Sequence, residues 1–494
     1  MDDEMEVALV SNRGPVSFIE TSDGFDKKRG AGGLAGALDP VARELGQKAV
    51  WISAATSEAD RKALAAGEAD SLEDLLGYPV HMLEIEPRRY SRYYDVVSNR
   101  MLWFANHCLW DELEIREFGE DELAAWDEAY EPVNEMFARA AADHADPDSV
   151  VLFQDYHLAT APLYLRKLHP EQTIFHFTHS SFCGPDGLER LPRPLPKRVI
   201  EGMLGADLVG FHVPDWANGF MACCERIGAN VDRTSGSVDH HGRRSWIRTY
   251  PIPIDPEGLR ERAESEPAVV WRERFLSGWT HGPPSPGRLI VRADRTEPSK
   301  NIIRGFEAFG RLLDRRPDLA ATTRFIACLY PSRQSMPEYR RYSDRIEQVV
   351  DEVKSRHPGS IQLFLENDFD RTLAALSIYD VLLVNPIMDG MNLVSKEGPV
   401  VNDASGILVL SRGAGSFDEL GRHAVEIADA LDVEATADAL ERALAMEPAE
   451  RTARAEALRE AAAARRPADW IHAQLEDLCE IKGGGAPVTP PPRT

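Results

Sequence analysis

The stretch of residues 381–397 constrains the fold of this chain more than any other. It opens with a short apolar run, breaks at Asn385-Pro386, turns through Asp389-Gly390 and resumes at Met391 with a helical pattern. This order predicts a strand, a loop and a helix start, whose N–H groups would attract a phosphate or diphosphate. Glu397 lies about two turns along that helix, where its carboxylate could accept hydrogen bonds from a ribose diol. An ordinary strand-turn-helix unit that binds no ligand has the same pattern.

A similar alternation of apolar strands and helical segments occurs in both halves of the chain. With 494 residues the chain is too long for one hydrophobic core, which predicts two domains. This alternation predicts an α/β protein with two doubly wound, Rossmann-like sheets facing a cleft. The expected strands are residues 7–11, 50–53, 150–154, 173–178 and 205–211 in the first half, and 288–292, 324–329, 361–365, 381–384, 406–410 and 424–427 in the second.

The proline-rich segment 250–256 is the expected boundary between the two domains. We therefore predict an N-terminal domain of residues 1–253 and a C-terminal domain of residues 254–466. Residues 483–494 are rich in glycine and proline and have low complexity. We expect them to form a disordered tail.

Composition excludes several classes of partner. The formal net charge of −25 argues against binding to nucleic acid, which requires a basic face. No apolar run approaches the roughly 18 residues of a membrane span, and the start lacks a basic region, so we expect a cytoplasmic protein that binds no membrane. The six cysteines show no C-x-x-C pairing and are expected to be reduced thiols in the core. The sequence leaves a homo-oligomer open.

Residues 389–397 read Asp-Gly-Met-Asn-Leu-Val-Ser-Lys-Glu, which resembles the donor-nucleotide motif D-G-M-N-L-V-x-K-E of the trehalose-6-phosphate synthase family. Further matches in the same order extend from about residue 7 to about residue 480. Members of this family are retaining glycosyltransferases with the GT-B fold. The resemblance implies this fold here, with a last helix, residues 467–482, that crosses back to the N-terminal domain. It also implies that the C-terminal domain binds a nucleotide sugar through Asp389, Gly390, Met391, Asn392, Leu393, Val394 and Glu397.

Cations, which the acidic composition makes comparatively scarce, follow several of the expected strands. Arg295 and Lys300 lie in a segment that resembles the family's R-x-D-x-x-K, and the resemblance implies that they bind the donor diphosphate and act in catalysis. Arg333 lies in a segment similar to the family's P-x-S-R, and Arg13 in a Ser-Asn-Arg sequence. By the same resemblance, both would contact the acceptor phosphate.

Residues near the ends of other strands complete the implied site. Asp155 lies in a segment similar to the family's H-D-Y-H-L, and His179 in one similar to L-H-I-P-F, which places both beside the reacting sugars as catalytic and acceptor-binding residues. Trp110 ends a segment that resembles F-x-N-x-x-L-W at the acceptor site. Gly32 and Gly33 match a glycine-rich element whose backbone approaches the donor.

The sequence departs from the family mainly on the acceptor side. The W-x-G-W element reads Trp51-Ile-Ser-Ala54, and the tyrosine nine residues before the acceptor tryptophan reads Met101 when counted back from Trp110. The H-I-P-F-P loop reads His179-Ser-Ser-Phe-Cys183, and the arginine before Asp-Gly is Met388. These changes affect the expected acceptor more than the expected donor.

The activity implied by the resemblance is transfer of glucose, with retention, from UDP- or GDP-glucose to glucose 6-phosphate, which gives an α,α-trehalose phosphate. The family needs no metal and no other cofactor. Two alternatives stay open. One is a pseudoglycosyltransferase that joins a nucleotide-activated cyclitol to a phosphorylated aminocyclitol, and the other is a catalytically idle sugar-nucleotide sensor. The sequence does not determine whether the donor base is uracil or guanine.

Overall fold

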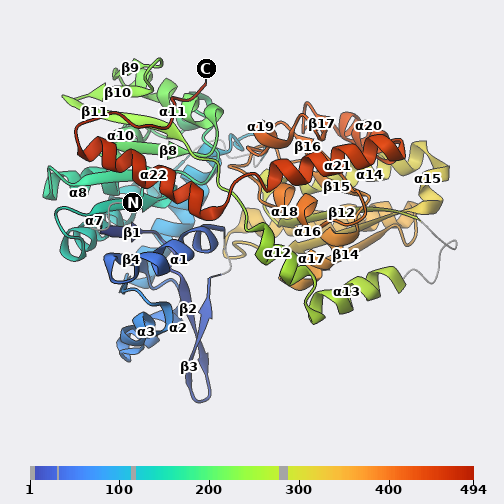
Figure 1. Cartoon of the computed structure of the whole chain (residues 1–494), viewed down its shortest axis with the longest axis horizontal. Coiled ribbons are helices and arrows are strands. Elements are labelled where there is room, and N and C mark those ends of the chain that lie inside the picture. The colour runs from blue at the N-terminus through green and yellow to red at the C-terminus, as the bar shows by residue number, and fades with distance from the viewer. Residues whose placement is uncertain (1–5, 31–32, 113–117, 278–286, 494) are drawn as a thin grey trace. The chain divides into compact units, whose positions relative to one another are not determined.

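The computed structural model describes residues 6–30, 33–112, 118–277 and 287–493. The chain forms two compact units, which divide between Ile252 and Pro253 and again between Arg466 and Pro467. The last segment of the chain therefore belongs to the N-terminal unit. Figure 1 labels the helices and strands of both units. Among the described residues, no helix is both long enough and apolar enough to cross a membrane.

The N-terminal unit contains a nine-stranded sheet in the order β5-β4-β1-β6-β7-β8-β11-β10-β9 among its described residues. Neighbouring strands from β5 to β11 pair in parallel, whereas β10 and β9 pair antiparallel at one edge. The strands are β1 (Val7–Val10), β4 (Ala49–Ala54), β5 (Val80–Leu83), β6 (Val150–Gln154), β7 (Thr173–Phe177), β8 (Leu208–Phe211), β9 (Asn230–Asp232), β10 (Ser237–His240) and β11 (Arg243–Thr249).

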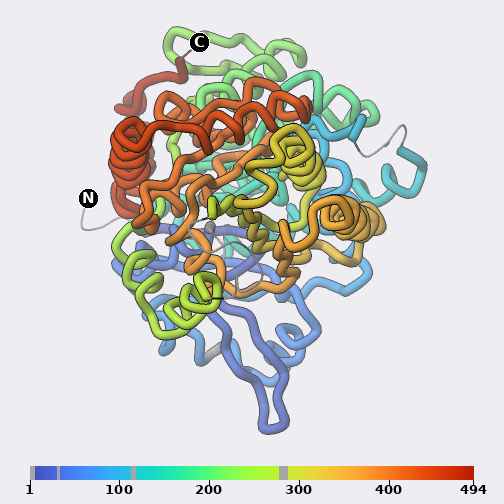
Figure 2. The backbone as a smooth tube through the Cα atoms, turned by 90° about the vertical axis from the view of Figure 1, so that its right-hand side faces the viewer, coloured from blue at the N-terminus to red at the C-terminus, as the bar shows by residue number. Residues whose placement is uncertain are grey.

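Helices accompany this sheet, and a separate hairpin, β2 (Val16–Thr21) and β3 (Gly24–Arg29), projects from the body of the unit (Figures 1 and 2). Strands β1, β6, β7 and β8 are buried at every position, as expected for parallel strands covered on both faces. The helices are α1 (Gly33–Leu45), α2 (Glu58–Ala65), α3 (Leu72–Leu76), α4 (Pro87–Ser91), α5 (Trp103–Asn106), α6 (Glu120–Ala125), α7 (Glu131–His144), α8 (Ala161–Leu168), α9 (Pro185–Leu188), α10 (Leu195–Met203), α11 (Pro214–Arg226) and α22 (Pro467–Lys482), with π-helical segments η3 (Arg92–Leu102) and η4 (Trp126–Tyr130).

The C-terminal unit contains a fully parallel six-stranded sheet in the order β14-β13-β12-β15-β16-β17 within the described chain. Its strands are β12 (Arg288–Arg295), β13 (Thr323–Tyr330), β14 (Ile361–Leu365), β15 (Val381–Val384), β16 (Ile407–Ser411) and β17 (Val425–Ile427). Its helices are α12 (Pro256–Ala263), α13 (Glu266–Ser277), α14 (Ile302–Arg315), α15 (Pro317–Thr322), α16 (Pro337–Arg356), α17 (Phe369–Ile378), α18 (Val394–Val401), α19 (Phe417–Leu420), α20 (Val433–Leu444) and α21 (Pro448–Ala462).

The apolar run of β15 contributes buried side chains to the hydrophobic cores on both faces of this sheet. Val381 and Leu383 belong to a core cluster with residues of α14, α16 and α20, whereas Leu382 and Val384 belong to a second cluster with residues of α17, α18 and α21. Successive side chains of a strand point to opposite faces, so a continuous apolar run produces a sheet buried on both sides. This arrangement holds the loop after β15 at a defined edge of the sheet.

The helix expected from Met391 begins later than predicted. Helix α18 starts at Val394, because Asn392 adopts the left-handed conformation with φ of 69°. The Asn392 side chain then accepts a hydrogen bond from the backbone N–H of Ser395 at 3.1 Å, in the manner of a helix cap. Before the helix, Asp389 forms an isolated parallel bridge with Ala414.

The end of the chain differs from the expected disordered tail. Helix α22 packs on the N-terminal unit, where the indole N–H of Trp470 donates to the carbonyl of Tyr250 at 2.8 Å. Beyond it, the N–H of Thr489 donates to Asp477 at 2.9 Å, and Arg248 donates to the carbonyl of Thr489 at 2.6 Å. Composition predicted disorder because the tail has few apolar groups, but its backbone finds polar partners on the unit that it covers.

Candidate active site

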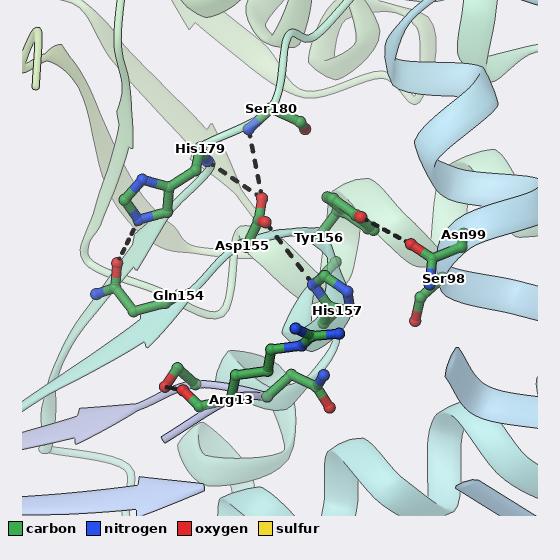
Figure 3. A network of polar contacts seen from close by, with 12 residues as sticks. Arg13, Ser98, Asn99, Gln154, Asp155, Tyr156, His157, His179 and Ser180 are labelled. Carbon is green, nitrogen blue, oxygen red and sulfur yellow. Dashed lines mark hydrogen bonds and ion pairs between the residues drawn. The ribbon is translucent and has the colours of Figure 1, made fainter. Parts of the chain in front are cut away.

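Asp155 organises the polar residues at the ends of β6 and β7 (Figure 3). It directly follows β6 and has a φ of 70°. Its Oδ1 accepts hydrogen bonds from the backbone N–H groups of His179 at 3.2 Å and Ser180 at 3.4 Å. The carboxylate therefore fixes the start of the loop that follows β7.

His179 is held as a neutral imidazole. Its Nε2 lies 2.9 Å from Oε1 of Gln154, and its ring lies 5.4 Å from that of His212. Burial, together with the charges that His212 and His176 would carry, lowers the pKa of His179 well below its usual value. Burial lowers the pKa of His176 to about 4. The site therefore presents a hydrogen-bonding imidazole rather than a cation.

Arg13 joins the same network through Tyr94. Its guanidinium donates to the hydroxyl of Tyr94 at 3.1 Å and lies 5.8 Å from the centre of that ring. The Tyr94 ring stacks on His157 with 5.5 Å between centres, and Nδ1 of His157 lies 3.7 Å from Oδ2 of Asp155. Arg13 and Asp155, both predicted from the sequence, are thus connected by two residues that the sequence did not single out.

The sequence contains the pattern N-x-x-L-W twice, and the structure distinguishes the two copies. The first copy ends at Trp103, nine residues after Tyr94, which is the spacing that the family requires between its tyrosine and tryptophan. Asn99 of this copy accepts a hydrogen bond from the hydroxyl of Tyr156 at 3.0 Å, next to Asp155. Met101, which the count from Trp110 placed at the tyrosine position, is fully buried. Counted from Trp103, the family's tyrosine spacing falls on Tyr94, which contacts Arg13.

The second copy, which ends at Trp110, braces the loop after His179. Trp110 is 3% exposed, and its indole N–H donates to the carbonyl of Gly187 at 2.9 Å. A disulfide joins Cys108 to Cys183, so the prediction that all cysteines are reduced thiols is wrong for this pair. Their Cα atoms are 5.9 Å apart, which suits a disulfide, but their separation of 75 positions gave no signal in the sequence. The acceptor role predicted for Trp110 stays a prediction.

Two of the predicted cations in the C-terminal unit share one carboxylate. Glu297, 1% exposed at its side chain, lies 3.0 Å from Arg295 and 3.5 Å from Arg333. The hydroxyl of Ser332 donates to the same carboxylate at 3.1 Å. The charge of Glu297 raises the pKa of Arg295, which keeps this guanidinium fully protonated. The sequence analysis did not single out Glu297, although it stands at the acidic position of the R-x-D-x-x-K element.

Lys300 and the Asp-Gly turn form a second charged pair. The Lys300 ammonium makes an ion pair with the Asp389 carboxylate, which also accepts from the Asn392 side chain at 3.0 Å. Burial is the largest single influence on the pKa of Lys300 and would lower it, but the charges of Asp389, Asp294 and Glu297 together raise the pKa. Lys300 therefore remains a cation, positioned beside the motif loop.

The loop of the motif is backed closely by a second loop. A Cβ on Gly415 would lie only 2.0 Å from the carbonyl oxygen of Gly390, so only glycine fits there. The Ser416 N–H donates to the carbonyl of Met391 at 2.9 Å. Leu393 is the N-cap residue of α18, and Val394 is its first residue.

Glu397 lies in the first turn of α18. Burial raises the pKa of Glu397 to about 7. Lys396, next to it, is buried and pairs with Glu419. Of the two predicted glycines, Gly33 begins α1, whereas Gly32 lies outside the described residues.

The parallel-sheet units and their charged loops define a glycosyltransferase of the GT-B fold. Residues 5–480 match the model of glycosyltransferase family 20, so the chain belongs to this family. It is 32% identical over 504 aligned residues to a trehalose-6-phosphate synthase of Mycobacterium sp. (strain KMS), an alignment that covers 98% of this chain and 97% of the relative.

Two further similar proteins carry names of two different activities, a valienyltransferase and a trehalose-phosphate synthase. Validamine 7-phosphate valienyltransferase of Streptomyces hygroscopicus subsp. jinggangensis is 28% identical, over 96% of this chain and 94% of the relative. The crystal structure of a UDP-forming α,α-trehalose-phosphate synthase from Burkholderia vietnamiensis superposes with a TM-score of 0.78 at 26% identity. That match covers 96% of this chain and 99% of the other.

Proposed function

We propose that this glycosyltransferase moves a glucosyl group from UDP- or GDP-glucose to glucose 6-phosphate with retention, giving α,α-trehalose phosphate. The observation that carries the proposal is the pairing of Arg13 with Tyr94 beside Asp155. This pair would supply the acceptor-side arginine and tyrosine that the resemblance to the trehalose-6-phosphate synthases implies, in a chain of net charge −25. The relative at 32% identity with that name supports the same reading.

Residues of the C-terminal unit would bind the donor. Arg295 and Lys300 would neutralise the diphosphate as its charge grows in the transition state. The ion pair of Lys300 with Asp389 orients the ammonium before the donor arrives. The Asp389-Gly390 turn and α18 would cradle the phosphates, and Glu397 would accept hydrogen bonds from the ribose diol.

Acceptor binding would use Arg13 and Tyr94 for the phosphate, with Arg333 as a further cation. Arg333 is held by the Glu297 carboxylate, with 3.5 Å between their charged groups. Asp155 and His179 would bind sugar hydroxyls near the reacting carbon. His179 suits this task because a neutral imidazole donates and accepts hydrogen bonds without opposing charge.

The chemical step would follow a front-face course. The bond between the anomeric carbon and the donor phosphate oxygen breaks, and the acceptor hydroxyl oxygen bonds to that carbon on the same face. The hydroxyl proton passes to the departing phosphate oxygen, so a nucleoside diphosphate leaves. The protein's tasks are to orient the acceptor and to stabilise the leaving group, which orientation and fixed charges accomplish.

The second candidate is the pseudoglycosyltransferase reaction between a nucleotide-activated cyclitol and a phosphorylated aminocyclitol. The relative named validamine 7-phosphate valienyltransferase supports it, at 28% identity. So do the acceptor-side departures, in particular the loop that reads His179-Ser-Ser-Phe-Cys183. An acceptor phosphate is common to both reactions, so Arg13 does not separate them.

The test supplies donors and acceptors in a matrix. The donors are UDP-glucose, GDP-glucose and a nucleotide-activated cyclitol. Each is incubated with glucose 6-phosphate, glucose or a phosphorylated aminocyclitol, and the products are identified by mass spectrometry. A disaccharide phosphate from glucose 6-phosphate alone supports the proposal. A C–N linked product establishes the second candidate instead. Nucleotide binding without any product would establish a sugar-nucleotide sensor.

A further inference from the structure

A cluster of Glu201, His240 and His241 lies in the N-terminal unit, on residues that no step of the proposed reaction uses. Their ligand-type atoms all lie within 4.8 Å of one another. The Nε2 atoms of His240 and His241 lie 3.2 and 3.3 Å from the same oxygen, Oε1 of Glu201. From this convergence we infer that the cluster is a binding site for a divalent transition-metal ion, with zinc as the best match.

The distances fit a tetrahedral ion. Ligand atoms bonded to Zn²⁺ at about 2.0–2.2 Å with tetrahedral angles lie roughly 3.3 Å apart. The two distances from Glu201 to the imidazoles already have this length. Two imidazoles and one carboxylate form a known zinc ligand set that leaves a fourth position for water. Borderline nitrogen ligands also favour Zn²⁺ over Mg²⁺, which prefers oxygen.

Local backbone structure holds the two histidines in place. His240 ends β10, and His241 and Gly242, with φ of 49° and 78°, form the two-residue turn that leads into β11. Positive φ at both positions is the signature of the tight turn that joins antiparallel strands. His241 is therefore fixed by a turn rather than by a long loop.

The carboxylate is brought to the hairpin by a separate contact. Glu201 lies on α10, and the hydroxyl of Ser245 in β11 donates to the carbonyl of Ala206, just after that helix, at 2.7 Å. This hydrogen bond holds the segment after α10 against the hairpin, so the contact between them does not depend on a metal. The side chains of Glu201 and His240 are 24% and 13% exposed, while that of His241 is 75% exposed, so an ion reaches the site from solvent.

Lys197 is the one neighbouring cation that these contacts identify. Its ammonium lies 3.6 Å from Oε1 of Glu201, one helical turn away on α10. A bound metal would compete with this ammonium for the carboxylate. Since the Lys197 side chain is 55% exposed, it can turn away, but its charge should weaken metal binding. A variant without this charge, Lys197→Met, should therefore bind the metal more tightly than the natural chain.

The first experiment titrates Zn²⁺ into the full chain, stripped with a chelator, by calorimetry. We expect one ion per chain, no response to Mg²⁺, and affinity at least roughly tenfold weaker in Glu201→Gln. The matched control is His144→Ala, since His144 and His81 form another close pair, with ring centres 4.0 Å apart. Equal zinc affinity in Glu201→Gln and the natural chain, or its loss in His144→Ala, would overturn the proposal.

The second experiment does not depend on a loss of binding. Lys197→Met should bind Zn²⁺ several-fold more tightly, and Co²⁺ in place of Zn²⁺ should give the intense visible absorption of a tetrahedral site. Zinc should also raise the thermal midpoint of unfolding by roughly 2–4 °C, because it binds only the folded chain. Unchanged affinity in Lys197→Met, or an octahedral Co²⁺ spectrum, counts against the site.

Discussion

The two units of this glycosyltransferase assemble their charged sites in different ways. In the C-terminal unit, Asp389, Asn392 and Glu397 lie in one stretch of nine residues, and Lys300 pairs directly with the first of them. In the N-terminal unit, Arg13 and Asp155 are 142 positions apart and are linked through contacts of Tyr94 and His157. Residues that lie together in one stretch can be detected in the sequence as a motif. Residues that come from distant segments form no single motif, and substitutions can alter one of these segments without altering the others.

The largest effect is expected from Lys300→Ala. Removing this ammonium should slow turnover by about a hundredfold or more, because the cation counts most when charge develops on the leaving diphosphate. Steady-state kcat is the measurement, with Lys354→Ala on α16 as the control in the same unit. Turnover within a factor of two of the natural enzyme would remove Lys300 from the chemistry.

Arg13→Met tests the dispersed site of the N-terminal unit. Loss of a charge-assisted hydrogen bond of about 1.5–3 kcal/mol should raise the acceptor KM by roughly 10- to 100-fold. Nucleotide binding without acceptor should stay unchanged, since the proposed diphosphate-binding residues Arg295 and Lys300 lie in the other unit. If glucose proves as good an acceptor as glucose 6-phosphate and Arg13→Met is fully active, there is no phosphate pocket at this arginine.

The contiguous site offers a pH test through Glu397. Burial raises the pKa of Glu397 to about 7, and only its ionised form accepts two ribose hydrogen bonds. Nucleoside diphosphate affinity should therefore rise as pH increases from about 6 to about 8, and Glu397→Gln should lose this rise. Glu397→Ala should weaken binding by about 1.5–3 kcal/mol while free phosphate binds as before. A pH-independent natural enzyme would contradict the role.

The pH dependence of folding stability should run opposite to that of nucleotide affinity. A carboxyl whose pKa is higher in the folded state than in the unfolded state favours the folded state most at low pH. This contribution is lost as pH rises towards 7, so the nucleotide-free protein should become less stable across that range, and Glu397→Gln should be less sensitive. Thermal unfolding of both proteins in matched buffers measures the difference.

The smallest effect is expected from Tyr94→Phe. The change removes one hydroxyl that accepts from Arg13 at 3.1 Å and keeps the ring that stacks on His157. Acceptor KM should rise about 2- to 10-fold, corresponding to one hydrogen bond of roughly 0.5–1.5 kcal/mol. Met101→Phe is the comparison, because Met101 is fully buried. A larger effect on acceptor KM at Met101 than at Tyr94 would restore the register counted from Trp110.

Sequence reasoning predicted the local structure of the contiguous stretch better than the contacts between the dispersed residues. It predicted the strand, turn and helix around Asp389 because the pattern is local, and it missed the delayed start of α18 because Asn392 supplies its own cap. It counted the tyrosine position from Trp110 although N-x-x-L-W occurs twice, and the contacts of Asn99 with Tyr156 and of Tyr94 with Arg13 distinguish the other copy. The role of Glu297 as a shared partner and the pairing of Cys108 with Cys183 depend on tertiary contacts, which spacing does not encode.

The Cys108–Cys183 disulfide also closes a covalent ring within the N-terminal unit. The two cysteines are 75 positions apart, and the ring they close includes β6, β7, Asp155 and His179. A protease that cuts once between them would leave a single molecule on a non-reducing gel and two fragments after reduction. A Cys183→Ser chain would separate into two fragments in both gels. The ring thus keeps Asp155 and His179 on one covalent molecule after a single cut between the two cysteines.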